Sequence, residues 1–100
     1  MVKPVVVEKE MGINEAEFFR NMRRTLEGRD HRVEGTAFIL EDNGGDGCRL
    51  EVAFEAQPPR TIALLSVPVA KISLTFTGYD KADRQAFVDL FDRHFQRGGG

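Results

Sequence analysis

The sequence predicts a two-layer α+β sandwich, in which two helices cover one face of a five-stranded, mainly antiparallel sheet. Three observations predict this fold class. Segments with strand or helix periodicity follow one another in the order β-α-β-β-β-β-α. Both helical segments are apolar along one side only. Most strand segments alternate apolar and polar residues, as a sheet with one buried face does. Packing both helices on that face buries all the apolar surfaces together.

The first strand is expected over Val2–Lys9, because its run of three valines carries the β-branched side chains that favour a strand. Pro4 has no N–H for a hydrogen-bonded ladder, so this strand is expected at an edge of the sheet. A helix is expected over Glu15–Glu27, since Asn14 is a good N-cap and Glu17 stands where it completes a capping box.

Four strands are expected between residues 32 and 77. Their expected ranges are Arg32–Glu41, Cys48–Ala56, Arg60–Val67 and Val69–Thr77. Segment 42–47 is rich in glycine, asparagine and aspartate, which tolerate the backbone angles of a turn. The prolines at positions 58, 59 and 68 are expected to interrupt the strands, because proline cannot donate to a ladder.

The last helix is expected to begin after Asp80, its N-cap, and to stop before Gly98. Its apolar side is rich in phenylalanine, and His94 falls within that side. Residues 1–100 are expected to form a single domain, with residues 98–100 as a flexible glycine tail.

Strands two to five are expected to form a meander, with the first strand closing the sheet beside the fifth. This order resembles one repeat of the TATA-box-binding-protein fold. It is also similar to the helix-grip core of START-type lipid-binding domains, without their extra strands. The second resemblance implies a ligand held between the sheet and the helices.

Composition excludes several function classes. Fourteen basic and sixteen acidic residues give a net charge of −2, which favours neither nucleic acid nor an acidic membrane as a partner. No apolar run approaches the ~18–20 residues of a membrane span, and the first ten residues do not resemble a signal peptide. A cytoplasmic protein without membrane attachment is therefore expected. The single cysteine excludes an internal disulfide.

Motifs for catalysis, metal binding or phosphate binding are missing from the sequence. It contains no GxxxxGK[ST], GxGxxG, HxxxH or CxxC pattern. We therefore expect no metal and no cofactor, assign no catalytic residue, and favour a binding protein over an enzyme.

Two helices on one sheet face leave the other face open. If alternate residues of the strand at 32–41 point into the core from Val33 on, Phe38 and Leu40 point outward. The strand at 60–67 then exposes one of two sets, either Ile62 and Leu64 or Ala63, Leu65 and Val67. An exposed apolar patch of this kind is typical of an interface. We expect the open face to bind a partner protein or a second copy in a two-fold dimer, through Phe38, Leu40, Leu65 and Val67.

Two further candidate sites are kept open. Arg20 and Arg24 lie one helical turn apart, and this like-charge pair either contacts an anion or acidic partner or belongs to a solvated face. His94 and Phe91 are the candidates for a pocket between helices and sheet. The leading hypothesis is a non-enzymatic binding or assembly module. The alternative is a protein that binds a small apolar or anionic ligand.

Overall fold

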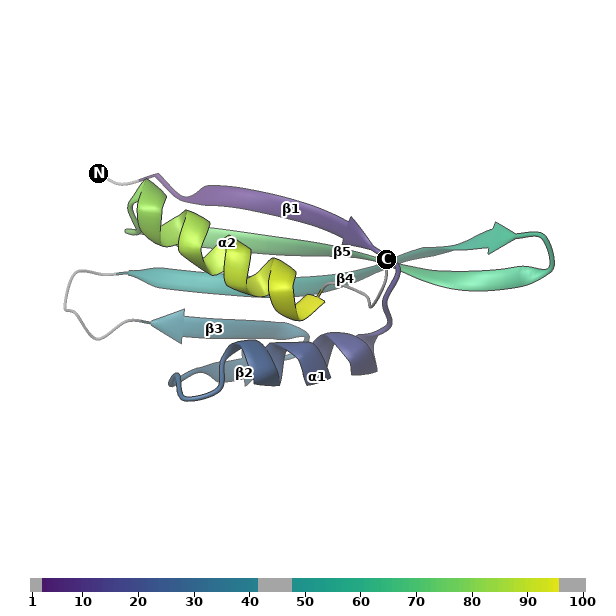
Figure 1. Ribbon diagram of the computed structural model, residues 1–100, viewed down its shortest axis with the longest axis horizontal. Helices are drawn as coiled ribbons and strands as arrows, with labels where there is room; N and C mark the ends of the chain where they lie inside the picture. The colour runs from purple at the N-terminus through teal and green to yellow at the C-terminus, as the bar shows by residue number, and fades with distance from the viewer. Residues whose placement is uncertain (1–2, 42–47, 96–100) are drawn as a thin grey trace.

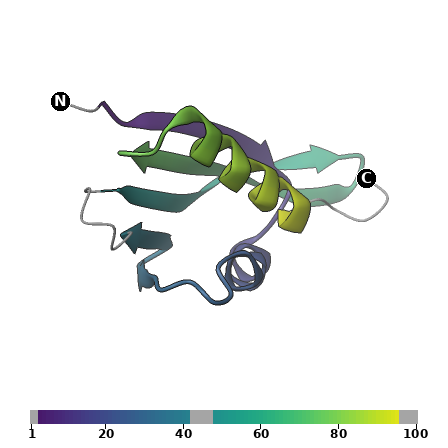
Figure 2. The same ribbon diagram turned by 60° about the vertical axis from the view of Figure 1, so that its left-hand side comes forward.

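The computed structural model describes residues 3–41 and 48–95 and confirms the predicted fold class (Figure 1). In chain order its elements are β1 (Val5–Met11), α1 (Glu15–Thr25), β2 (Arg32–Glu34), β3 (Ala37–Glu41), β4 (Arg49–Ile62), β5 (Leu65–Thr77) and α2 (Lys81–Phe95). The strands form one antiparallel sheet in the order β1-β5-β4-β3-β2, so β1 is an edge strand beside β5, as expected. Both helices lie on the same face of this sheet (Figure 2). The turn expected at 42–47 and the tail at 98–100 lie outside the described residues.

Both helices begin at the predicted caps. The Asn14 side chain accepts a hydrogen bond from the Glu17 N–H at 2.8 Å, and the Glu17 carboxylate accepts one from the Asn14 N–H at 3.4 Å. The Asp80 carboxylate accepts a hydrogen bond from the Asp83 N–H at 2.8 Å. These short-range bonds satisfy N–H groups that have no partner within the helix. The end of α1 at Thr25 comes slightly earlier than expected.

Phenylalanine side chains join the two layers. Phe18 of α1 is completely buried, and its ring centre lies 5.2–6.1 Å from those of Phe38, Phe54 and Phe95. These three residues belong to β3, β4 and α2. In α2, Phe91 stacks on Phe95 with ring centres 4.0 Å apart. The helices and the sheet therefore share one continuous aromatic core.

The expected orientation of β3 is wrong. Phe38 and Leu40 do not point to the open face, because they are only 1% and 3% exposed in the core beneath the helices. Phe38 pairs with Val52 and Leu40 with Leu50, and both partners are core residues of β4. Directly paired residues lie on the same side of a sheet, so this register turns both side chains inward.

The expected strand at 32–41 is two strands. It is divided by a turn at Gly35, whose φ of +61° is a conformation that glycine adopts without strain. Conversely, β4 and β5 continue through the prolines, and the prediction that prolines end these strands is wrong. Pro58 and Pro59 lie in a register shift between Gln57 and Arg60.

The prolines are tolerated because the sheet is only two strands wide where they lie. The last β4 residue paired with β3 is Ala53, and β1 pairs with β5 no farther than Ala70. Beyond these residues β4 and β5 have a neighbour on one side only. A missing N–H costs little at such an edge or at a bulge.

β4 and β5 are longer than the helices that cover them. At ~3.3 Å per residue, the 14 residues of β4 span about 46 Å. At 1.5 Å per residue, the 11 and 15 residues of the helices span about 16 and 22 Å. The uncovered ends of the two strands and the turn between them, residues 57–69, project from the body (Figure 1). We call this segment the arm.

Removal of the central ring is expected to destabilise the whole domain. Phe18→Ala should lower the free energy of unfolding by about 3–5 kcal/mol, because it leaves a cavity where α1, α2, β3 and β4 meet. Urea denaturation followed by circular dichroism measures this loss. The matched control is Phe19→Ala, whose ring is partly exposed and should cost clearly less. Equal losses in the two variants would contradict the central role of Phe18.

Candidate interaction surface

The arm exposes aliphatic side chains at its free end. Leu64 is 100% exposed, Leu65 69% and Ile62 56%. Ile62 pairs with Leu65, and Arg60 pairs with Val67, so these four side chains lie on one face of the two-stranded ribbon. Val67 is half-buried. Of the expected interface residues, Leu65 and Val67 therefore lie on the arm, together with Ile62.

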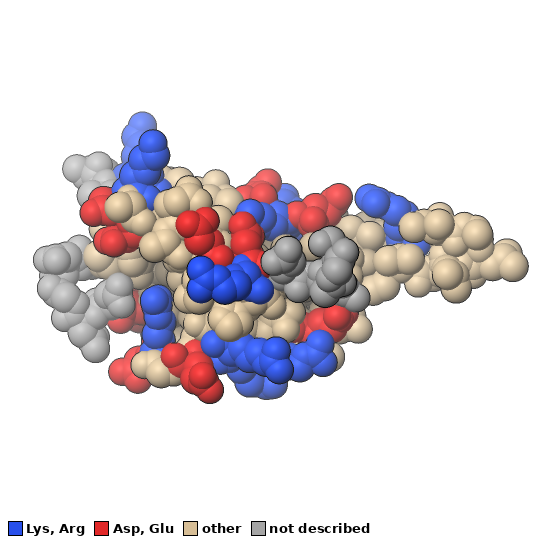
Figure 3. Space-filling view, viewed as in Figure 1, with Lys and Arg blue, Asp and Glu red and all other residues tan. Residues whose placement is uncertain are grey.

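The arm carries almost no charge. Arg60 is the one charged residue in the sequence from 57 to 69. Its guanidinium group lies 3.7 Å from the carboxylate of Glu10 in β1. In the space-filling view the arm is uncharged along most of its length, whereas charged side chains cover much of the body (Figure 3). The arm is therefore a nearly uncharged segment that projects from a domain whose surface carries many charged side chains.

The turn at the free end has an uncommon composition. Ala63 and Leu64 form a two-residue turn, and Ala63 has a φ of +56°. Hairpin turns with a positive φ at this first position normally hold glycine there. The left-handed region costs an L-residue about 1–2 kcal/mol. Such strain is often found where a segment makes functional contacts.

A small cleft lies where the arm joins the body. It has a volume of about 250 Å³ and is lined mainly by apolar side chains, among them Ile13, Phe54, Ala56, Pro59 and Pro68. Because Phe54 belongs to the core and the cleft includes the start of α1, it opens on the helix side of the sheet. We call it the root cleft.

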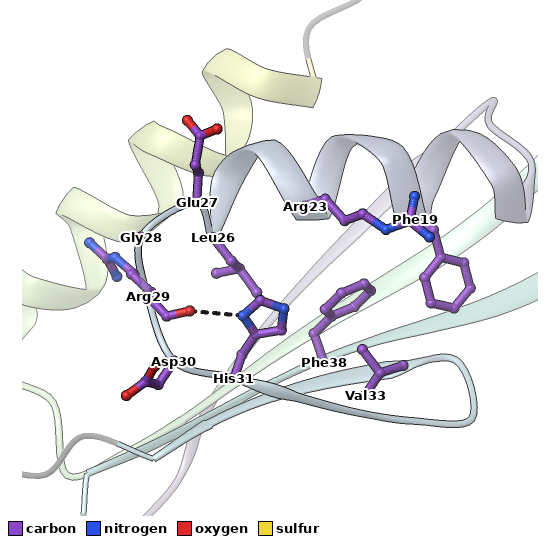
Figure 4. A pocket seen from close by; sticks show the side chains of 10 residues that line it. All are labelled: Phe19, Arg23, Leu26, Glu27, Gly28, Arg29, Asp30, His31, Val33 and Phe38. Carbon is purple, nitrogen blue, oxygen red and sulfur yellow. Dashed lines mark hydrogen bonds between the residues drawn. The ribbon is translucent and has the colours of Figure 1, made fainter.

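A larger cleft of about 620 Å³ lies at the end of α1 (Figure 4). Its apolar wall includes Phe19, Val33 and Phe38, and Arg23 and His31 lie at its rim. The Nδ1 atom of His31 lies 2.9 Å from a backbone carbonyl oxygen, with which it shares a hydrogen bond. This cleft combines a hydrophobic wall with charged groups of both signs, since Glu27, Arg29 and Asp30 also line it.

Ion pairs lie along the open face of the sheet. Arg32 contacts the carboxylates of Glu34 and Glu41, and Lys71 lies 3.2 Å from the carboxylate of Glu8. The hydrogen bond from Arg32 and its positive charge lower the pKa of Glu41 below its usual value. Ile39 lies on this face but is only 3% exposed. The expected apolar patch of the open face is therefore replaced by paired charges.

The remaining candidate residues are separated. Arg20 and Arg24 are exposed on α1, in a region where basic side chains gather (Figure 3), and within the described ranges neither forms an ion pair. Phe91 is fully buried and His94 half-buried in α2. Neither lines the root cleft or the cleft at the end of α1.

Residues 3–41 and 48–95 contain no group of three or more histidine, cysteine, aspartate or glutamate residues placed to hold a metal ion. No helix in this part of the chain is long and apolar enough to cross a membrane.

Relief of the strained turn is expected to stabilise the arm. Ala63→Gly should slow the local opening of the arm about fivefold, because glycine adopts the positive φ without a Cβ clash. Hydrogen exchange of the backbone amides in residues 60–67 measures the change. Ser66→Gly is the matched control and should speed opening, since position 66 has no positive φ. Faster exchange in Ala63→Gly would show that the turn is not strained.

Comparisons with protein families and with curated sequences identify no relative of this chain. No protein-family model matches the chain, and a search of curated protein sequences finds no significant match. The candidate surface is therefore defined by the geometry of the chain itself.

Proposed function

We propose that the protein is a non-enzymatic protein-binding or assembly module, and that the arm is its binding element. The observation that carries this proposal is the exposure of Ile62, Leu64 and Leu65 together at the end of a projecting, nearly uncharged hairpin. Contiguous apolar side chains on a surface mark interaction sites. The open face, which the sequence favoured for this role, instead carries ion pairs.

The energetics of the arm support a bound state. A two-stranded hairpin without a covering layer is marginally stable in water. Burial of one exposed leucine or isoleucine contributes about 1.5–3 kcal/mol. A partner that covers Ile62, Leu64 and Leu65 would therefore add several kcal/mol, and would order the arm at the same time.

The alternative function is the binding of a small apolar or anionic ligand. It is supported by the cleft at the end of α1, whose volume lies within the ~300–1,000 Å³ of ligand sites. Arg23 would provide a cation for an anionic group. Between the helices and the sheet, where a helix-grip domain would hold its ligand, stacked Phe91 and Phe95 occupy the interior.

Site-specific photo-crosslinking tests the role of the arm. A benzophenone amino acid is placed at Leu64, and in a matched control at Val6, which is 53% exposed on β1. After irradiation in the native host, the variant at Leu64 should give several times more macromolecular adduct than the variant at Val6. Mass spectrometry identifies the adducts. Equal adduct yields at the two positions would contradict the proposed function.

A further inference from the structure

We propose that the partner of the arm is a second copy of this chain. In this dimer two arms lie antiparallel across a two-fold axis, and the free end of each covers the root cleft of the other. The inference rests on the proposed function, because it takes the arm to be the binding element.

The twist of the arm brings its apolar face to the side on which the root cleft opens. In Figure 1 β4 lies below β5 in the body but above it in the arm, and Figure 2 shows the same exchange. Two-stranded ribbons twist strongly. In a flat sheet Ile62 and Leu65 would continue the open face, since residues at alternate positions of β5 from Leu65 on lie there. The twist carries them round toward the helix side.

The free end and the root cleft are complementary in chemistry and size. The free end presents Leu64, Leu65 and Ile62, and the cleft is lined mainly by apolar groups. An apolar cavity of roughly 150 Å³ accepts a benzene-sized group. A cleft of about 250 Å³ therefore has room for a leucine side chain.

Antiparallel arms satisfy two-fold symmetry. The contact of free end with root is made twice, once by each copy, as in an isologous interface. The six residue-to-residue steps from Gln57 to Ala63 span about 20 Å. This length holds the two negatively charged bodies apart by more than the ~8 Å screening length at physiological salt. Arg60, the one charged residue of the arm, is already paired with Glu10 of its own chain. The carboxylate that lines the root cleft is that of Glu15, at the start of α1.

The prolines favour contact through faces over contact through edges. A β-sheet continued across two copies would need free N–H groups along the outer edge of β4 or β5. Pro58, Pro59 and Pro68 remove such donors near the root of the arm. Side chains on the apolar face remain available. Because the contact is limited to two free ends and two root clefts, we expect a dissociation constant in the roughly micromolar range.

Sedimentation equilibrium of the purified chain tests the dimer. The wild type should show a monomer–dimer equilibrium, and Leu65→Ser should weaken it roughly 100-fold, because each substitution acts twice in a two-fold interface. Ala56→Phe, which fills the root cleft from within the same chain, should weaken it as well. The control Val6→Thr lies outside the arm and should leave it unchanged. A monomer at all concentrations, or equal effects of Leu65→Ser and Val6→Thr, would overturn the proposal.

Disulfide trapping tests the geometry, in a Cys48→Ser background. When Leu64→Cys and Ala56→Cys chains are mixed and oxidised, the 64–56 crosslink should form between copies, because the free end lies on the root cleft. Two Leu64→Cys chains should not crosslink, since antiparallel arms hold their free ends far beyond the ~7 Å that a disulfide allows. A dominant 64–64 crosslink would overturn the antiparallel arrangement.

The two proposals fail in different ways. If the purified chain stays monomeric while the photo-crosslinker at Leu64 captures a different protein, self-pairing is wrong and the arm is still a binding element. If adducts at Leu64 contain lipid alone, the arm is a membrane contact and both proposals are wrong. Both proposals are supported if the photo-adducts at Leu64 consist of two copies of this chain and the 64–56 disulfide forms between copies in the trapping experiment.

Discussion

The pairing of β4 with β5 is the interaction on which the rest of the structure depends. These two strands form the centre of the sheet, and β1 and the β2–β3 hairpin attach on either side. Both helices pack on one side of the sheet, and Phe18 of α1 and Phe91 of α2 belong to the same buried cluster as the core residues of β4 and β5. Because the helices are shorter than the strands, the pair continues beyond the core as the arm. The length of this one pairing thus produces both the core and the candidate binding surface.

Different interactions dominate on the two faces of the sheet. Phenylalanine rings fill the helix side, where burial of apolar surface is the main stabilising term. On the open side, exposed ion pairs such as Arg32–Glu41 and Lys71–Glu8 keep the surface polar. Such pairs contribute little to stability, but they make the face a poor place for an apolar partner. The exposed aliphatic residues of the arm therefore stand apart from both faces.

Patterns that act over three or four residues, and the order in which the strands connect, were predictable. The Asn14 and Asp80 caps and the position of β1 beside β5 follow from short-range hydrogen bonding and connection rules. The arm was not predictable in this way, because the turn at Ala63 and Leu64 lacks the glycine or asparagine that normally marks a hairpin. A signal was present nonetheless, since the apolar run 61–67 is flanked by prolines on both sides. Only the width of the sheet explains why those prolines do not end the strands.

The fold class, the helix starts and an excess of exposed apolar strand residues, the expected open-face patch, follow from local signals in the sequence. Local periodicity and capping carry that information. The tertiary structure decided where the excess lies. The orientation of Phe38 depends on its register with Val52, and the exposure of Leu65 depends on where the neighbouring strands and helices stop. Both are long-range properties, because a strand's two faces and two edges are defined only by what packs against them.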